Sequence, residues 1–339
     1  MSPPLSVDAK LVAWGERWDW SPLTHPQNNK PRRTRTGVLL AAVISNKRNR
    51  AQQPMTAARA RATLTALVRK SPQVVVKISG GGKGLSHVMA HIDYISRQGQ
   101  LPLENEAEEI LHGERGLQDI REAWANGRSW VPDESHRREA INIVLSMPEG
   151  TNQDAVYQAA RAFARDYFAD NHEYVTVLHT FDTDPDPQPS RHPHVHIAVK
   201  VRGKNGLRLN PKKADLMEWR EAFAEQLRDR GIHAVATRRR THLQRTQGES
   251  QAVREKRRRH EKLDRLSTAR PQEKAVKKAR DNVRELVRDF GTLATALARS
   301  DNTDDRVLAQ QLGARVVERV RGDRVLASEL NKGGRERGR

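Results

Sequence analysis

The chain has 339 residues and a formal net charge of +19, from 61 Lys and Arg residues against 42 acidic ones. This excess of positive charge favours a polyanionic partner such as nucleic acid. The absence of cysteine excludes disulfides and thiolate chemistry, and no stretch approaches the roughly 20 apolar residues that span a membrane. The N-terminus also lacks the basic-then-apolar layout of a secretory signal, so we expect a cytoplasmic protein without membrane insertion.

The first segment of the chain is a basic flank. Residues 1–70 contain 13 Lys or Arg residues and three acidic residues. This composition predicts a largely disordered arm that attracts nucleic acid, with a short basic helix from Thr56 to Arg69. A tail that only keeps the protein in solution is the alternative.

The compact part of the chain is predicted to begin at residue 71. Val74–Ile78 has the β-branched composition of a strand, and a glycine-rich turn leads into a helix from about Leu85 to Arg97. Tyr94 lies nearly opposite the apolar stripe of this helix, so we expect its ring to be presented to solvent rather than packed in the core. Five residues form that stripe: Leu85, Val88, Met89, Ile92 and Ile95.

A series of strands and helices follows a charged segment over residues 101–138. Short apolar runs predict the strands, and amphipathic segments predict the helices. In chain order we expect a strand at 141–147, a helix at about 153–169, a strand at 174–180, a strand that opens at 192–196 and continues to residue 201, a helix at about 214–230 and a strand at 232–236.

The segment His-Pro-His-Val-His at 192–196 is the most informative pattern in the chain. Side chains alternate along a strand, so His194 and His196 point the same way, while Val195 points into the core. With His179, near the end of the preceding apolar run, they predict a three-nitrogen site for a divalent metal ion. Half-buried sheet histidines without an ion are the alternative.

The C-terminal region has a different character. Residues 238–270 hold 12 Lys or Arg residues and four acidic ones, and segments 272–300 and 303–323 have helical spacing of apolar residues. We therefore expect a basic helical region over 241–339 that binds DNA or a partner protein.

A solvent-facing tyrosine and a metal site together point to attack on a phosphodiester, with the metal neutralising charge on the phosphate. An all-histidine site leans toward Mn²⁺ on ligand grounds, and Mg²⁺ fits where phosphate oxygens and water complete its shell. Asp182 and Asp184 are the nearest acids, and either is a candidate to orient a liganding histidine. Solvated loop acids are the alternative for both.

At this point the chain resembles a known family. Two segments, 73–82 and 91–99, together resemble the nucleophile region of plasmid relaxases. A third segment, 146–151, is similar to the second motif of that family. His179 followed by 192–196 resembles their metal-binding motif, one histidine followed by Pro-His-x-His. The resemblance covers about residues 72–240. It identifies the chain as a plasmid relaxase, a mobilisation nuclease of the HUH endonuclease superfamily, closest to the branch that includes T-DNA border-nicking relaxases.

The resemblance implies site-specific and strand-specific nicking of an origin of transfer by transesterification. Tyr94 would be the nucleophile that forms a 5′-phosphotyrosine bond and so starts conjugative plasmid mobilisation. The resemblance gives the ligands of Mg²⁺ or Mn²⁺ as His179, His194 and His196. The chain departs from the family at Phe181, where the pattern has an acid, and this leaves open whether Asp182 or Asp184 takes that role.

The family fold implies an α+β domain over residues 71–240, with an antiparallel sheet of about five strands and helices on one face. The implied partners are origin-of-transfer DNA, single-stranded or supercoiled, accessory relaxosome proteins and a type IV coupling protein. The alternating arginines of residues 333–339 resemble tails that mark relaxases for export through a type IV secretion channel. A frayed basic end is the alternative for this tail.

Three other functions compete with this interpretation. A rolling-circle replication initiator carries its tyrosine after the histidines, whereas the last tyrosine of this chain is Tyr174. A histidine-triad nucleotide hydrolase would match 192–196 but leave Tyr94 unexplained, and Pro193 is a poor fit to an apolar position of that signature. A non-enzymatic basic DNA-binding protein would account for the charge but not for the organised histidines.

Overall fold

The computed structural model describes residues 6–19, 55–237 and 273–321. The chain divides into two compact units. One is the continuous segment Ser71–Ala236, and the other is built from the two flanks, Met1–Lys70 and Thr237–Arg339. Each unit has its own apolar core, and each is described by itself.

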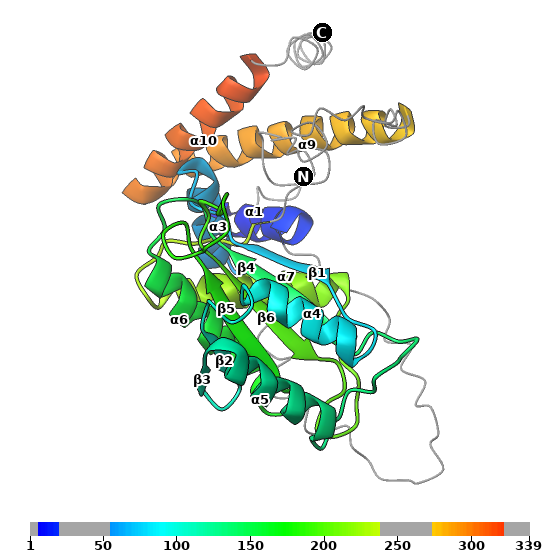
Figure 1. Ribbon diagram of the computed structural model, residues 1–339. Coiled ribbons are helices and arrows are strands. Elements are labelled where there is room, and N and C mark those ends of the chain that lie inside the picture. The colour runs from blue at the N-terminus through cyan, green and yellow to red at the C-terminus, as the bar shows by residue number, and fades with distance from the viewer. Residues whose placement is uncertain (1–5, 20–54, 238–272, 322–339) are drawn as a thin grey trace, which may run out of the picture. The chain divides into compact units, whose positions relative to one another are not determined.

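A six-stranded antiparallel sheet forms the centre of the Ser71–Ala236 unit (Figure 1). The strand order is β1-β4-β6-β5-β2-β3, so the two histidine-bearing strands, β5 and β6, lie side by side. The strands are β1 (Val75–Gly80), β2 (Leu103–Asn105), β3 (Ile110–Leu111), β4 (Ala140–Ser146), β5 (Tyr174–His179) and β6 (His194–Lys200).

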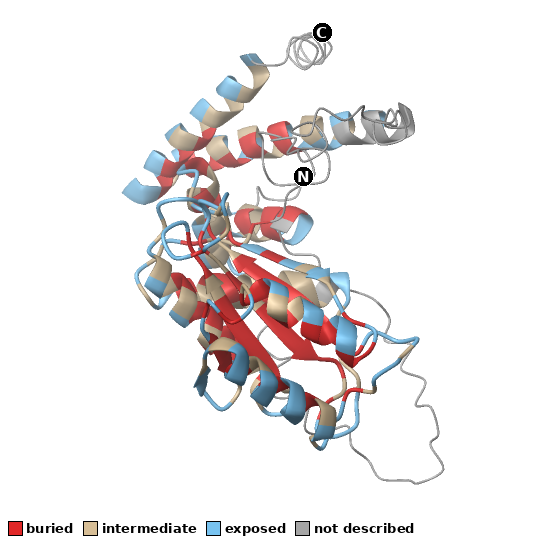
Figure 2. Cartoon of the chain, viewed as in Figure 1, coloured by how far each residue is buried: buried red, intermediate tan, exposed pale blue. Residues whose placement is uncertain are grey.

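Helices cover both faces of this sheet, which Figure 2 shows as a buried layer. On one face lie α4 (Leu85–Ile95) and α5 (Gly113–Asn126). On the other lie α6 (Gln153–Ala164), its π-helical continuation η2 (Arg165–Ala169) and α7 (Lys213–Arg228). The alternation of β6 divides its side chains between the two layers: Val195, Ile197 and Val199 pack with α6 and α7, and Ala198 packs with α4 and α5.

The α+β class, the antiparallel sheet and the C-terminal helices are confirmed. The sheet has six strands where about five were expected, and helices cover both of its faces rather than one. β2 and β3 lie in the charged segment 101–138 and are too short to produce a hydrophobic pattern. The strand expected at 232–236 does not form, and Val235 makes only an isolated bridge to Gln73.

The second unit is helical. Its N-terminal helices are α1 (Val7–Trp14), with the π-helical turn η1 (Gly15–Asp19), and α3 (Ala57–Val68). They pack with α9 (Glu273–Ala298) and α10 (Thr303–Arg321) around one apolar core. That core includes Leu11, Trp14, Leu64, Phe290, Leu297 and Leu312.

Within the described parts of residues 1–70, α3 corresponds to the helix expected over Thr56–Arg69, and α1 with η1 is a helical segment that was not expected. These helices bury apolar residues against the C-terminal helices, and the spacing of apolar residues within 1–70 gave no hint of a distant partner. Segment 20–54, the basic stretch 238–270 and the arginine tail 333–339 lie outside the described residues. Within the described ranges, no helix combines the length and apolar character that crossing a bilayer requires.

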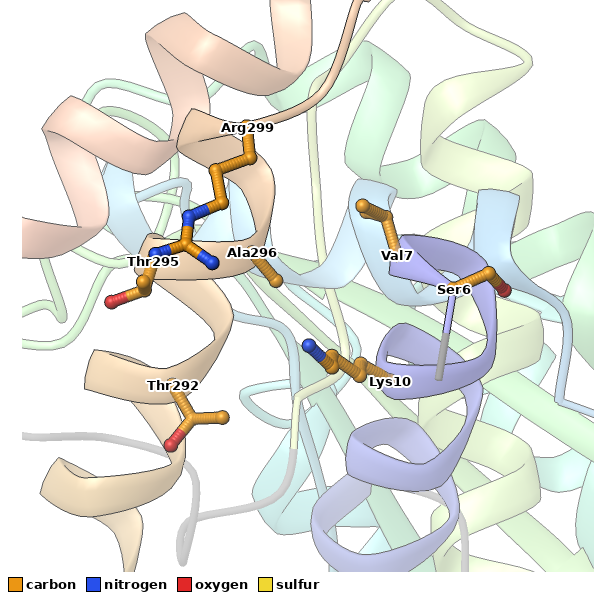
Figure 3. Close-up of a pocket in the computed structure, with 7 residues that line it drawn as sticks. All are labelled: Ser6, Val7, Lys10, Thr292, Thr295, Ala296 and Arg299. Atoms are coloured by element: carbon orange, nitrogen blue, oxygen red, sulfur yellow. The ribbon is translucent and has the colours of Figure 1, made fainter. Parts of the chain in front are cut away.

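The helical unit contains a cavity of about 470 Å³ between α1 and the end of α9 (Figure 3). Figure 3 shows the side chains of Lys10 and Arg299 on its opposite sides. Its lining includes no histidine and no acid, so it is separate from the predicted metal site. The full lining is Ser6, Val7, Lys10, Thr292, Thr295, Ala296 and Arg299.

Candidate metal centre and nucleophile

The antiparallel pairing of β5 and β6 brings three histidines together. The register places His179 directly opposite His194, and His196 lies two residues further along the same face of β6. The ring centroids are 5.0 Å apart for His179 and His194, 4.7 Å for His179 and His196, and 5.1 Å for His194 and His196. One ring nitrogen from each lies within 4.8 Å of the others, so the cluster has the size of a metal site.

All three imidazoles favour the neutral form that binds a metal. Burial lowers the pKa of His194 to about 4. Burial, together with the neighbouring His179 and His194, lowers the pKa of His196 to about 2, and burial also lowers that of His179. Because a protonated imidazole has no free lone pair, these shifts keep the ligand atoms available at neutral pH.

Hydrogen bonds orient the two rings of β6. Nδ1 of His194 lies 2.9 Å from the carbonyl oxygen of His192, so Nδ1 carries the proton and Nε2 is free for a metal. Nδ1 of His196 lies 3.2 Å from the side-chain amide nitrogen of Asn142. The buried Oδ1 of Asn142 has no hydrogen-bond partner in the part of the chain that the structure describes. Turning this amide by 180° would let Oδ1 accept a hydrogen bond from Nδ1–H of His196 and leave Nε2 of that ring unprotonated.

His179 is held from both sides. Its Nδ1 lies 2.9 Å from a carboxylate oxygen of Asp184, and its Nε2 lies 2.6 Å from the carbonyl oxygen of Ile95. A neutral ring that donates Nδ1–H to Asp184 has an unprotonated Nε2 facing that carbonyl, which is unfavourable. Three clustered imidazole donors, with Asp184 as the carboxylate that orients His179, are a donor set that fits a divalent ion.

Arg97 connects the cluster to the helix that carries Tyr94. Its guanidinium donates to both carboxylate oxygens of Asp184, at 2.8 and 2.9 Å, and to the backbone oxygen of Tyr94 at 3.0 Å. Burial, the largest single influence, would raise the pKa of Asp184, but it is outweighed by several others together: the hydrogen bonds from Arg97, the backbone hydrogen bond from Asp186, and the charge interactions with His179 and Arg97. The pKa of Asp184 is therefore lowered to about 2. Asp184 is therefore a carboxylate at neutral pH, and α4 is fixed against the β5–β6 loop.

Tyr94 is 62% exposed, as its position opposite the apolar stripe of α4 predicts. The guanidinium carbon of Arg97 lies 5.2 Å from the centre of its ring. The ring of His91, one helical turn earlier, stacks at 6.4 Å from it. Nε2 of His91 is buried and has no hydrogen-bond partner among the described residues. The exposed ring of Tyr94 therefore lies next to a guanidinium and an imidazole.

The structure distinguishes Asp184 from Asp182, either of which the sequence allowed as the acid that orients a histidine. Asp184 contacts His179, whereas Asp182 accepts a hydrogen bond of 2.9 Å from Gln153. Sequence reasoning gave no part in the site to Asn142, His91 or Arg97. The spacing His91-x-x-Tyr94 on α4 was a usable signal for His91, because residues three apart on a helix share a face. Arg97 lies in the turn after the end of α4. No sequence pattern pointed to Asn142.

Comparison with known proteins finds a family whose profile matches the segment that contains this site. Residues 94–232 match the profile of the family "Relaxase: MobA/VirD2-like, nuclease domain". The match begins at Tyr94 and includes all three clustered histidines. This segment is a relaxase nuclease domain.

Individual relatives agree with the family match. The T-DNA border endonuclease VirD2 of Rhizobium rhizogenes is 30% identical over 121 residues, which is 32% of this chain and 28% of the relative. The protein of the same name from Agrobacterium fabrum is 29% identical over 121 residues, 32% of this chain and 27% of the relative. The chain thus covers little more than a quarter of the length of these relatives.

Proposed function

We propose that this chain nicks one strand of DNA at a specific origin of transfer, with Tyr94 as the nucleophile, and so initiates conjugative mobilisation of a plasmid. The observation that carries the proposal is the connection from the exposed Tyr94 through Arg97 and Asp184 to a cluster of three neutral histidines. The relaxase family match over the same residues supports it.

The reaction is a transesterification. The hydroxyl oxygen of Tyr94 attacks the phosphorus of one phosphodiester, an O–P bond to tyrosine forms, and the bond between phosphorus and the 3′ oxygen breaks. The proton lost by the phenol is balanced by the proton that the departing 3′ oxygen gains. The 5′ phosphate stays on the protein, and its bond energy is conserved for later rejoining.

His179, His194 and His196 would hold a divalent ion, Mg²⁺ or Mn²⁺. Such an ion supplies positive charge at the scissile phosphate when it is bound. The residues of this chain position that phosphate: Asp184 fixes the ring of His179, and Arg97 fixes Asp184 relative to α4. The net charge of +19 supports nucleic acid as the substrate. The same proposal includes two kinds of protein partner, accessory relaxosome proteins and a type IV coupling protein.

A nicking assay with the full chain tests this function. Supercoiled plasmid that carries the cognate origin is incubated with the protein and Mg²⁺ or Mn²⁺, then treated with SDS. We expect open circles whose 5′ ends are blocked by protein and become free only after protease treatment, and no nicking in EDTA. A nick with a free 5′ end before protease treatment would contradict the tyrosine mechanism.

The matched pair Asp184→Asn and Asp182→Asn tests the support of the metal ligands. Asp184→Asn weakens the hold on the ring of His179, and we expect a loss of about 10- to 100-fold in Mn²⁺ affinity, measured by calorimetry. Asp182→Asn changes an acid of the same loop that contacts Gln153 instead, and should leave the affinity within about twofold. Equal effects of the two substitutions would remove Asp184 from the site.

A further inference from the structure

An exposed aromatic ring lies beside the histidine cluster and has no part in the chemistry above. Phe181 is 48% exposed, although it follows the buried His179 by only two residues. The guanidinium carbon of Arg191 lies 5.3 Å from the centre of its ring. Leaving half of a phenylalanine in water forgoes favourable burial, so its position requires an explanation.

The loop between β5 and β6 holds this ring outward. Phe181 occupies a tight turn in which the hydroxyls of Thr180 and Thr183 are hydrogen-bonded at 2.6 Å and the backbone nitrogen of Asp184 donates to the oxygen of Thr180. Asp184 is anchored in turn by Arg97. The ring is therefore presented by an ordered turn that is tied to the cluster.

The position of the pair follows from the strand register. His179 and His194 face each other at the ends of β5 and β6, and Phe181 and Arg191 are the residues two and three positions further into the connecting loop. A strand of DNA with its scissile phosphate at the cluster would pass its neighbouring nucleotide close to this pair.

The charge of the pair favours a neutral base over a phosphate. Arg191 lies 3.2 Å from a carboxylate oxygen of Glu149, and Asp182 follows Phe181 directly, so the patch has no excess of positive charge. What it offers is the π-face of a ring with a guanidinium beside it, and unpaired bases stack on such faces with little dependence on sequence. Paired bases are covered by their neighbours in the duplex and cannot do so.

We propose that Phe181 and Arg191 form a stacking platform for one unpaired nucleobase next to the scissile phosphate. The proposal rests on the function proposed above, and it assigns two residues of this chain to the binding of one base of its DNA substrate.

Binding of non-cognate DNA tests the platform without any cleavage. The probes are a fluorescent 12-nucleotide oligo(dT) and a 12-base-pair duplex, with the full chain in EDTA. We expect Phe181→Leu to weaken binding of oligo(dT) at least about fivefold, because stacking contributes ~1 kcal/mol or more per base, and to change duplex binding less than about twofold. Phe181→Trp keeps a flat aromatic face and should restore the affinity for oligo(dT).

The matched control is Trp130, an exposed ring whose centre lies 5.8 Å from the guanidinium carbon of Arg202, beyond the opposite end of β6. Trp130→Leu should change oligo(dT) affinity less than about twofold. Equal weakening of oligo(dT) and duplex by Phe181→Leu, or a larger effect of Trp130→Leu, would overturn the proposal.

Photocrosslinking gives a direct readout of the contact. Oligo(dT) with 5-iodouracil at each position should crosslink to the peptide that contains Phe181, and Phe181→Leu should abolish that product. Crosslinks confined to other peptides would overturn the platform. The protein could show these binding results and still form no covalent adduct with origin DNA. That outcome would contradict the proposed nicking function but would support the proposed nucleobase site.

Discussion

Replacing Tyr94 with phenylalanine is expected to abolish strand cleavage, with a loss of about 10³-fold or more in the nicking rate. The substitution removes one oxygen, the atom that would bond to phosphorus, and leaves the ring in place. Because Tyr94 is 62% exposed, the change creates no cavity and should leave the thermal unfolding temperature unchanged. Gel assays of open circles and of covalent protein–DNA adducts measure the loss.

Tyr167→Phe is the matched control for this substitution. The hydroxyl of Tyr167 lies 3.1 Å from a carboxylate oxygen of Glu218, within the layer of α6 and α7 rather than beside the histidines. The control should nick at close to the rate of the unsubstituted protein. Adduct formation by Tyr94→Phe at the normal rate would show that another group is the nucleophile.

The substitutions His194→Ala and His196→Ala are expected to eliminate nicking while DNA binding stays within a few-fold. Each removes one of three nitrogen donors, and a site left with two donors holds a divalent ion far more weakly. DNA affinity depends mainly on the basic surface and should therefore survive. Calorimetry with Mn²⁺ and a binding assay in EDTA separate the two effects.

His87→Ala controls for the loss of an imidazole as such. His87 is exposed on α4, the helix of Tyr94, and does not belong to the cluster. It should bind Mn²⁺ and nick DNA as the unsubstituted protein does. Undiminished Mn²⁺ affinity in either His194→Ala or His196→Ala would exclude that residue as a ligand.

The parts of the fold that could be predicted are those with a local periodic signal. Alternation along 192–201 indicated the histidine face, and helical spacing indicated the exposure of Tyr94. The predicted trio of histidines does come together, because antiparallel pairing places His179 opposite His194.

What could not be predicted depends on contacts between distant residues. The choice between Asp182 and Asp184 is made by the turn that begins at Thr180, which directs the later acid back toward His179. The sequence did not show whether the helices lie on one face of the sheet or on both. An amphipathic pattern shows that a helix has a buried face, but it does not show which side of a sheet that face packs against. Asn142 lies within an apolar strand and gave no periodic signal of its role.

The pairing of the two flanks has a consequence for how the chain is made. The side chains of Arg17 and Asp289 form an ion pair although they are 272 residues apart, and α1 shares a core with α9 and α10. In topological terms the Ser71–Ala236 unit is an insertion within the helical unit. During synthesis α1 and α3 leave the ribosome long before their partners exist, while the inserted domain can fold first. Its folding brings Ser71 and Ala236 into one compact body and shortens the loop that must close before the flanks can meet.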